Sequence, residues 1–330
     1  MHFKAGRPFQ RKLRRPFSFK LRSLLSFINT DNRNFVEICS IKQIELNLPA
    51  QQQKLLEDIT SDLEKINGVI AVVLGGSYAA GTASDTSDID IGIYYDAAQP
   101  FHIDEIRAVA LKYATSDPTI TGFYEWGPWV NGGAWITTPH GKVDFLYRNL
   151  EQVRNTIEKA KNGEWENHFE QQPPYGFSSV IYLAETEICI PLYDPHKAIE
   201  KLKREVLEYP PKLREAIIKQ SLWSAEFTIM HAESFWGKRD VYNSIGCLTR
   251  AVKNIVAALF AINEYYPVGD KRAIERLEKA AKKPANLKEK IEIILCADKE
   301  TISMNIEHLK VLHQEVIKLA DGIYQPLYQL

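Results

Sequence analysis

The stretch between residues 69 and 95 constrains the fold of this chain most strongly. Residues 69–74 have the sequence VIAVVL, whose length and β-branched composition are typical of a buried strand, and a glycine bounds the run on each side. Residues 88–95 (DIDIGIYY) begin with strict alternation of acidic and apolar residues, which predicts a second strand. Since residues i and i+2 of a strand share a face, Asp88 and Asp90 present two carboxylates side by side. The isoleucines between them then face a core on the opposite side.

The rest of the sequence predicts an α+β fold, with a small mixed sheet followed by an all-α helical bundle. Strand-like runs over residues 134–138 and 142–147 flank a Pro-His-Gly turn and predict a hairpin. A run over residues 188–193 is expected at the edge of the sheet, because Pro191 cannot donate a ladder hydrogen bond. Helical periodicity predicts the remaining elements, over residues 51–66, 103–114, 218–236, 241–262, 271–281, 286–297 and 302–319.

The chain is expected to have four parts. Eight of its 41 basic residues lie within residues 1–30, which hold no acidic residue, so the remainder of the chain is acidic overall. We expect a basic, disordered arm over residues 1–45 and a sheet domain over residues 46–162. A connecting loop and edge strand are expected over residues 163–195, and the helical domain over residues 196–330.

Composition excludes several classes of protein. With 45% hydrophobic and 25% charged residues, the chain is typical of soluble globular proteins. Its longest apolar run, residues 255–262, is far shorter than the about 20 residues of a bilayer span, so no membrane crossing is expected. The four cysteines form no CxxC pair, so we expect neither a zinc site nor a disulfide framework, and the cytoplasm is the expected compartment. The acidic body lacks the clustered Lys and Arg of a nucleic-acid interface, so nucleic acid is not an expected partner.

The two aspartates and the glycines before them have the chemistry of a metal and phosphate site. Carboxylates held side by side raise each other's pKa, and Mg²⁺ relieves this because it favours carboxylate oxygens together with substrate phosphates. Gly75 and Gly76 end the first strand, and their N–H groups, with the Ser77 hydroxyl, are suited to hold phosphate oxygens. Asp144 interrupts an otherwise apolar strand, so it is a third candidate ligand or a base for a hydroxyl proton.

These residues together resemble the signature of the DNA polymerase β-type nucleotidyltransferase superfamily. The signature consists of Gly76-Ser77, a ten-residue spacer, Asp88-x-Asp90 and a later strand that carries Asp144. From about residue 50 the chain is also similar to bacterial proteins in which a nucleotidyltransferase domain precedes a helical domain of the type called DUF4037. More distantly, it is similar to aminoglycoside and lincosamide nucleotidyltransferases. The segments that carry the second resemblance are VDFLYR (143–148), PYGF (174–177), PLYDP (191–195) and LFAIN (259–263) followed by Lys271.

The resemblance implies an activity and a metal. Members of the superfamily transfer a nucleoside monophosphate, usually AMP from ATP, to a hydroxyl acceptor and release pyrophosphate. By this resemblance Asp88 and Asp90 hold Mg²⁺, with two ions expected, and Asp144 is a further metal ligand or the base.

The resemblance also implies a nucleotide site. Gly76 and Ser77, together with Gly75, would hold the triphosphate, and Lys271 from the helical domain is a weaker candidate for the same role. The sequence departs from the family at Ala80, where many relatives carry Arg, so one phosphate contact of those relatives is missing here.

Each candidate also has a plain structural interpretation. In that interpretation Asp88 and Asp90 lie on a solvated strand face. Asp144 is then paired with a neighbouring Lys or Arg, and Lys271 is a solvated surface lysine. Glu185 and Glu187 are candidates for acceptor binding or for the base. The Trp-Gly-Pro-Trp segment over residues 126–129 suits an aromatic substrate wall and loop packing equally well.

Three functions fit these observations. The first is nucleotidyl transfer to a small hydroxylated molecule, and an acidic body suits a cationic, aminoglycoside-like acceptor. The second is AMP transfer to a protein, as in an antitoxin-like enzyme, with the helical domain as the docking surface. The third is a non-catalytic nucleotide-binding sensor, which would have no need to keep all three carboxylates. Addition to RNA ends is disfavoured because the body has no basic track.

Overall fold

The core of the structure is a mixed sheet of six strands in the order β3-β4-β5-β2-β1-β8. The computed structural model describes residues 48–84 and 86–328, so the predicted arm over residues 1–45 lies outside the described residues. Within the sheet, β2 and β5 pair in parallel, and the other neighbouring strands pair antiparallel. The strands are β1 (Val69–Leu74), β2 (Ile89–Tyr95), β3 (Thr119–Ile120), β4 (Gly133–Thr138), β5 (Gly141–Asn149) and β8 (Ile190–Tyr193). The predicted mixed sheet, with a Pro-containing strand at its edge, is confirmed.

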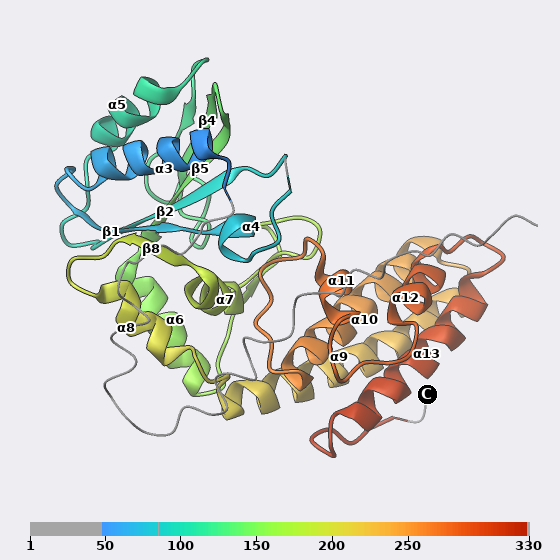
Figure 1. The fold of residues 1–330 in the computed structure, drawn as a ribbon. Helices are drawn as coiled ribbons and strands as arrows, with labels where there is room; N and C mark the ends of the chain where they lie inside the picture. Colours follow the sequence, from blue (N-terminus) through green and yellow to red (C-terminus); the bar gives the residue numbers. More distant parts are fainter. Residues whose placement is uncertain (1–47, 85, 329–330) are drawn as a thin grey trace, which may run out of the picture. The chain divides into compact units, whose positions relative to one another are not determined.

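The first face of the sheet is apolar and packs on two helices. Alternate residues of β2 and β5 point to this face and are almost fully buried, among them Ile91 and Phe145. Helix α3 (Ala50–Leu63) contacts β1, and α5 (Ile103–Tyr113) contacts β4 and α3. Figure 1 shows these two helices together on one side of the sheet. Because these residues face the helices, the alternate residues of β2 and β5, Asp90 and Asp144 among them, point to the other face of the sheet.

The second face carries the aspartates and joins the helical region. Ala71, Val73 and Tyr94 lie on this face, and they belong to one continuous apolar core with the helices that follow the sheet. Helices α6 (Leu150–Lys161), α7 (Val180–Ile188) and α8 (Ala198–Glu205) lie on this side in Figure 1. The acidic positions of the sheet therefore face the helical part of the chain.

The segment expected as a connecting loop and edge strand also contains a buried helix. In α7, Val180 to Ala184 are all buried and so is Thr186, so the helix has no solvated stripe. A run of consecutive buried residues gives no 3.6-residue alternation, which is why periodicity did not reveal this helix. A short hairpin of β6 (Asn167–His168) and β7 (Phe177–Ser178) precedes it. Lys203 of α8 donates hydrogen bonds to the carbonyls of Thr186, Glu187 and Cys189 and so stabilises the C-terminal end of α7.

The remaining helices form the predicted bundle. The long helix α9 begins with Pro211 at its first position, which suits the fixed φ of proline, and the Asp240 side chain caps α10 by accepting from Asn243 N–H at 3.1 Å. The pairs α9–α10, α10–α13 and α9–α13 are in contact. The helices are α9 (Pro211–Gly237), α10 (Val241–Ile262), α11 (Ala273–Leu277), α12 (Leu287–Leu295) and α13 (Ile302–Leu319), with the four-residue α4 (Gly76–Ala79) in the sheet region.

Helix α10 is long and apolar enough, by length and composition, to cross a bilayer. Half of its most apolar window is buried inside the protein, and the helix packs against α9, α12 and α13. The central helix of a bundle needs the same apolar character. The packing of α10 inside the bundle therefore accounts for its apolar composition.

A buried ion pair ties α7 to the aspartate-bearing face. Arg148 of β5 is only 6% exposed, and it donates to both carboxylate oxygens of Glu185 at 2.8 and 2.9 Å. Its guanidinium also lies over the ring of Tyr182, 5.4 Å from the centroid. A planar guanidinium matches a carboxylate in this bidentate way, which fixes orientation as well as charge.

We predict that Glu185→Gln lowers the free energy of unfolding by about 1.5–3 kcal/mol, because it leaves the buried Arg148 without its charged partner. Glu215→Gln is the matched control, since Glu215 forms an exposed pair with Lys219 and its loss should change stability far less than Glu185→Gln does. Urea unfolding of both variants measures the difference. Equal small effects would contradict an anchoring role for the pair.

Candidate active site

Asp90 and Asp144 lie directly opposite each other on the two parallel strands. They are Cα partners in the register of β2 and β5, so their side chains leave the sheet on the same face. Asp88 lies immediately before β2, two residues from Asp90. All three side chains are half-buried. The structure thus brings the predicted carboxylates to one region of the second face.

The carboxylates disturb one another electrostatically. Burial, and then the negative charges of Asp144, Asp88 and Glu185, raise the pKa of Asp90 to about 6. Burial and the charge of Asp88 likewise raise the pKa of Asp144 to about 6. Within the described part of the chain, no hydrogen bond or ion pair stabilises the ionised form of any of the three carboxylates. Structural carboxylates are normally paired, so this arrangement is typical of a functional site.

Gly76 makes room for the Asp90 carboxylate. A Cβ atom placed on Gly76 would overlap Oδ2 of Asp90, and the residue has φ +57°, a conformation that glycine adopts without strain. Gly76 opens the short helix α4, which also contains Ser77. The glycine therefore holds the start of α4 directly against the carboxylate.

The structure gives Gly75 a different role from the one predicted. Its N–H donates a 2.8 Å hydrogen bond to the carbonyl of Asp90, which continues the pairing of β1 with β2. That N–H is therefore engaged in the sheet and is not available to a phosphate oxygen. Gly76 and Ser77, in the first turn of α4, retain N–H groups without a partner in the helix, as every helix start does.

The donor set fits a divalent cation by its chemistry. Carboxylates that are half-buried, mutually repelling and without hydrogen-bond donors are the oxygen ligands that Mg²⁺ accepts in proteins. In residues 48–84 and 86–328, however, no three side chains of His, Cys, Asp or Glu gather closely enough to hold one ion. The three-carboxylate metal site therefore stays a prediction, supported by the chemistry of the residues and not by their present geometry.

The helical region brings a positive charge to the acidic face. Lys271, just before α11, is exposed, and its charge lowers the pKa of both Asp90 and Asp144 against the larger effect of burial. The neighbouring Arg272 donates a 3.0 Å hydrogen bond to the carbonyl of Thr82, in the loop between α4 and β2. The charge of Lys271 therefore acts on the carboxylates, whereas its predicted role at the triphosphate stays a prediction, and Arg272 forms a contact that the sequence did not indicate.

The other predicted candidates are positioned differently. Glu185 is bound by Arg148, so it contributes negative charge near Asp90 as a paired carboxylate. Glu187 lies in the last turn of α7, and its charge acts on Tyr266 of the helical region. Sequence spacing could not distinguish these two glutamates, because the partner of Glu185 is 37 positions away in the chain.

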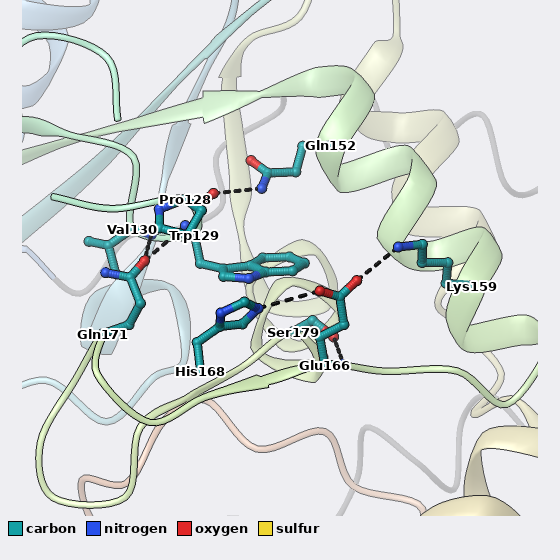
Figure 2. A network of polar contacts seen from close by, with 9 residues as sticks. All are labelled: Pro128, Trp129, Val130, Gln152, Lys159, Glu166, His168, Gln171 and Ser179. Atoms are coloured by element: carbon teal, nitrogen blue, oxygen red, sulfur yellow. Dashed lines mark hydrogen bonds and ion pairs between the residues drawn. The ribbon is translucent and has the colours of Figure 1, made fainter. Parts of the chain in front are cut away.

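The Trp-Gly-Pro-Trp segment serves packing. Trp126 stacks on Trp135 with ring centroids 4.7 Å apart, and Trp129 is 7% exposed and packs on Phe177. Figure 2 shows Trp129 beside His168, with Gln171 accepting hydrogen bonds from the backbone N–H groups of Trp129 and Val130. A surface cavity of about 630 Å³ lies along α6, and Trp129 lines it, whereas the three aspartates, Gly75, Gly76, Ser77 and Lys271 do not. The segment therefore packs in the fold, and one of its tryptophans also borders a cavity separate from the three aspartates.

Comparison with known proteins defines the class of this domain. Residues 54–125 match the family model of the nucleotidyltransferase domain, a range that includes β1, α4, Asp88 and Asp90. The crystal structure of a nucleotidyltransferase-like protein from Exiguobacterium sibiricum is similar, with a TM-score of 0.41, 8% sequence identity and coverage of 82% of this chain and 76% of that chain. No protein of curated function matches the sequence. The chain carries a nucleotidyltransferase domain, and its enzyme class is that of the nucleotidyltransferases.

We predict that Gly76→Ala lowers the rate of nucleotidyl transfer by about 100-fold or more, because the added methyl displaces the Asp90 carboxylate. Gly81→Ala is the matched control. Gly81 also has positive φ, at +67°, but a Cβ there meets no atom within 4 Å. Both variants should lose about 1–2 kcal/mol of stability from backbone strain, while only the first loses activity. Equal activities of the two variants would show that Gly76 has no special relation to Asp90.

We also predict that Asp144→Asn stabilises the fold at pH 8 in EDTA. With a folded-state pKa of about 6 against the ordinary 3.8, native Asp144 retains a proton that the unfolded chain releases. It therefore costs stability increasingly as pH rises through that window, and the cost is complete above about pH 6. The urea midpoint of the variant should exceed that of the parent at pH 8, and the gap should close toward pH 4. Asp104→Asn, at a fully exposed carboxylate, should show no such pH dependence, and a parallel response of both variants would contradict the prediction.

Proposed function

We propose that the protein is an Mg²⁺-dependent nucleotidyltransferase that transfers AMP from ATP to a hydroxyl group of a small molecule and releases pyrophosphate. The observation that carries the proposal is the opposed pair of Asp90 and Asp144, unpaired and half-buried, beside a glycine that touches Asp90. The match of residues 54–125 to the nucleotidyltransferase domain supports the reaction class.

In this proposal the aspartates have distinct tasks. Asp88 and Asp90 hold Mg²⁺, and Asp144 is the third ligand or the acceptor of the hydroxyl proton. When bound, Mg²⁺ supplies positive charge that polarises the α-phosphate and offsets the charge of the departing pyrophosphate. The oxygen of the acceptor forms a bond to the α-phosphorus, the bond from that phosphorus to the bridging oxygen breaks, and the proton leaves to a carboxylate. A carboxylate with raised pKa accepts a proton more readily than an ordinary one, which suits Asp144 for this step.

The phosphates would be held from both sides of the acidic face. Gly76 and Ser77 offer the N–H groups of the first turn of α4, and the Ser77 hydroxyl adds a further donor. Lys271 offers its ammonium group from the helical region. Positioning and charge stabilisation of this kind supply most of the rate in phosphoryl chemistry.

A cationic, hydroxylated acceptor of the aminoglycoside type is the proposed second substrate. The acidic excess of the chain outside residues 1–30 and the negative charge of Glu185 near Asp90 favour a positively charged molecule over a nucleic acid. We propose the cytoplasm as the compartment, since Cys189, Cys247 and Cys296 are free thiols.

We predict that Asp90→Asn and Asp88→Ala each reduce pyrophosphate release by at least about 100-fold without unfolding the protein, since each removes a charge that the transition state requires. Asp104→Asn, whose carboxylate is exposed on α5, is the control. The assay offers each of the four nucleoside triphosphates with a panel of aminoglycosides and other amino alcohols. Retained turnover in both site variants would reject the assignment. Label from ATP on a polypeptide would instead favour a protein acceptor, and binding of ATP without any product would favour a sensor.

A further inference from the structure

A groove lies along α6, away from the three aspartates. It consists of a cavity of about 630 Å³ and an adjoining cavity of about 310 Å³, and Lys159, Glu164 and Glu166 line both. Asn149 lines the larger cavity at the end of β5, whereas Asp144 lies near the start of that strand. The two positions are roughly 16 Å apart along the strand, at about 3.3 Å per residue. This α6 groove is therefore separate from the site of the proposed reaction.

Trp129 brings an unpaired hydrogen-bond donor to the α6 groove. Its side chain is 7% exposed and stacks on Phe177, and its carbonyl accepts a hydrogen bond from the Tyr182 hydroxyl. Within the described part of the chain the indole N–H donates no hydrogen bond, and it is not sealed from solvent. A buried tryptophan normally finds an acceptor for this N–H. Because the ring lines the larger cavity, a ligand bound there can supply the missing acceptor.

A tyrosine with a strained backbone lies at the same cavity. Tyr124 has φ +62°, a conformation that is costly for a bulky residue, and it is 44% exposed. Its N–H donates a 3.0 Å hydrogen bond to Oδ1 of Asn131, and its hydroxyl accepts one of 2.9 Å from Nδ2 of Asn149. These contacts hold the aromatic ring beside the cavity that it lines. The exposed ring can there cover the apolar stem of a lysine or stack with a guanidinium.

Two asparagines of the groove have a spacing that suits a peptide backbone. Asn155 and Asn162 both line the larger cavity, and they are about 10 Å apart along the axis of α6. An extended chain in the polyproline II conformation presents the same side about every 9 Å. An asparagine side chain offers both a donor and an acceptor, as a peptide unit does. Asn162 gives one N–H to the carbonyl of Glu158, which leaves its oxygen and its second N–H for a ligand.

The α6 groove is negatively charged. Among the described residues that line it, Lys159 is the one cation, and it pairs with Glu166 at 2.8 Å, as Figure 2 shows. Glu151 lies in the first turn of α6 and Glu164 just after its last turn. Within the described part of the chain neither of these two glutamates forms an ion pair. Uncompensated carboxylates therefore flank the two asparagines.

We propose that the α6 groove is a docking site for an extended basic peptide segment of a partner protein. Lysine or arginine side chains of the peptide pair with Glu151 and Glu164, and its backbone lies against Asn155 and Asn162. One of its carbonyls accepts the hydrogen bond of the Trp129 indole. A compact cation would satisfy one carboxylate but would not span α6, so the spacing favours an extended ligand. The inference does not rest on the proposed function, because none of these residues lies on the face of the sheet that carries the aspartates.

Calorimetric titration of the full chain with two synthetic, end-capped peptides tests the proposal. In the spaced peptide, about five glycine and serine residues separate two lysines, so that the two charges span a length comparable to that of α6. In the adjacent peptide, the same residues are reordered so that the two lysines are neighbours. The spaced peptide should bind at least about threefold more tightly, because it alone reaches both free carboxylates.

Three variants of the groove separate its contacts. Trp129→Phe keeps the packing and removes the indole N–H, so it should weaken the spaced peptide by about two- to tenfold. A non-specific attraction between charges would not respond to this change. Glu151→Gln and Glu164→Gln should each weaken the spaced peptide by about two- to fivefold. Glu289→Gln, at an exposed carboxylate of α12, is the matched control and should have no effect.

Several outcomes would overturn the docking site. They are equal binding of the two peptides, equal effects of Glu151→Gln and Glu289→Gln, and failure of the parent to bind either peptide. Glucosamine that binds as tightly as the spaced peptide and displaces it would replace the peptide by a small hydroxylated cation. The glutamate variants alter exposed side chains, so they test the proposal even where Trp129→Phe lowers stability. Absence of peptide binding in a protein that releases pyrophosphate from ATP would leave the proposed function intact.

Discussion

The structure depends on the register that places Asp90 opposite Asp144 on two parallel strands. Once this register is set, the isoleucines of β2 and the aromatic residues of β5 point together to the opposite face, where they are buried on the side of α3 and α5 (Figure 1). A shift by one residue would exchange the two faces and place carboxylates in an apolar core, at a large cost in free energy. The acidic pair is therefore specified by the same pattern that specifies the core, and the site cannot vary independently of the fold.

The second face balances its acids with cations from several elements. Arg148 comes from the same strand as Asp144 and neutralises Glu185 of α7, whereas Lys271 comes from the helical region. Without Arg148, Glu185 of α7 would be a fourth uncompensated carboxylate near the site; the arginine pairs with it and so holds α7 in place. The remaining charge on Asp88, Asp90 and Asp144 is left for ligands, and burial together with this excess negative charge raises the pKa values of Asp90 and Asp144.

Much of the sheet and of the bundle could be predicted from the sequence, because a strand with one buried face alternates and an amphipathic helix repeats every 3.6 residues. β2, the hairpin of β4 and β5, the edge strand with Pro191 and the long helices were found in this way. Helix α7 was missed because its five buried apolar residues are consecutive, so they give no helical alternation. The engaged N–H of Gly75, the pairing of Glu185 with Arg148 and the contact of Arg272 with Thr82 join residues that periodicity cannot relate. Lys271 was named as a candidate from a resemblance, and the effect of its charge on the pKa of Asp90 and of Asp144 became evident only in the fold.

The apolar core shared by the sheet and the helices has an evolutionary consequence. Ala71, Val73 and Tyr94 belong to one continuous apolar core that also includes residues of α7, α9, α10 and α13, so the helical region is not a detachable module. Recombination that exchanged this region for an unrelated bundle would interrupt that continuous core. New acceptor preferences are then expected to arise by point changes in the loops and exposed helix faces, with the shared core inherited intact.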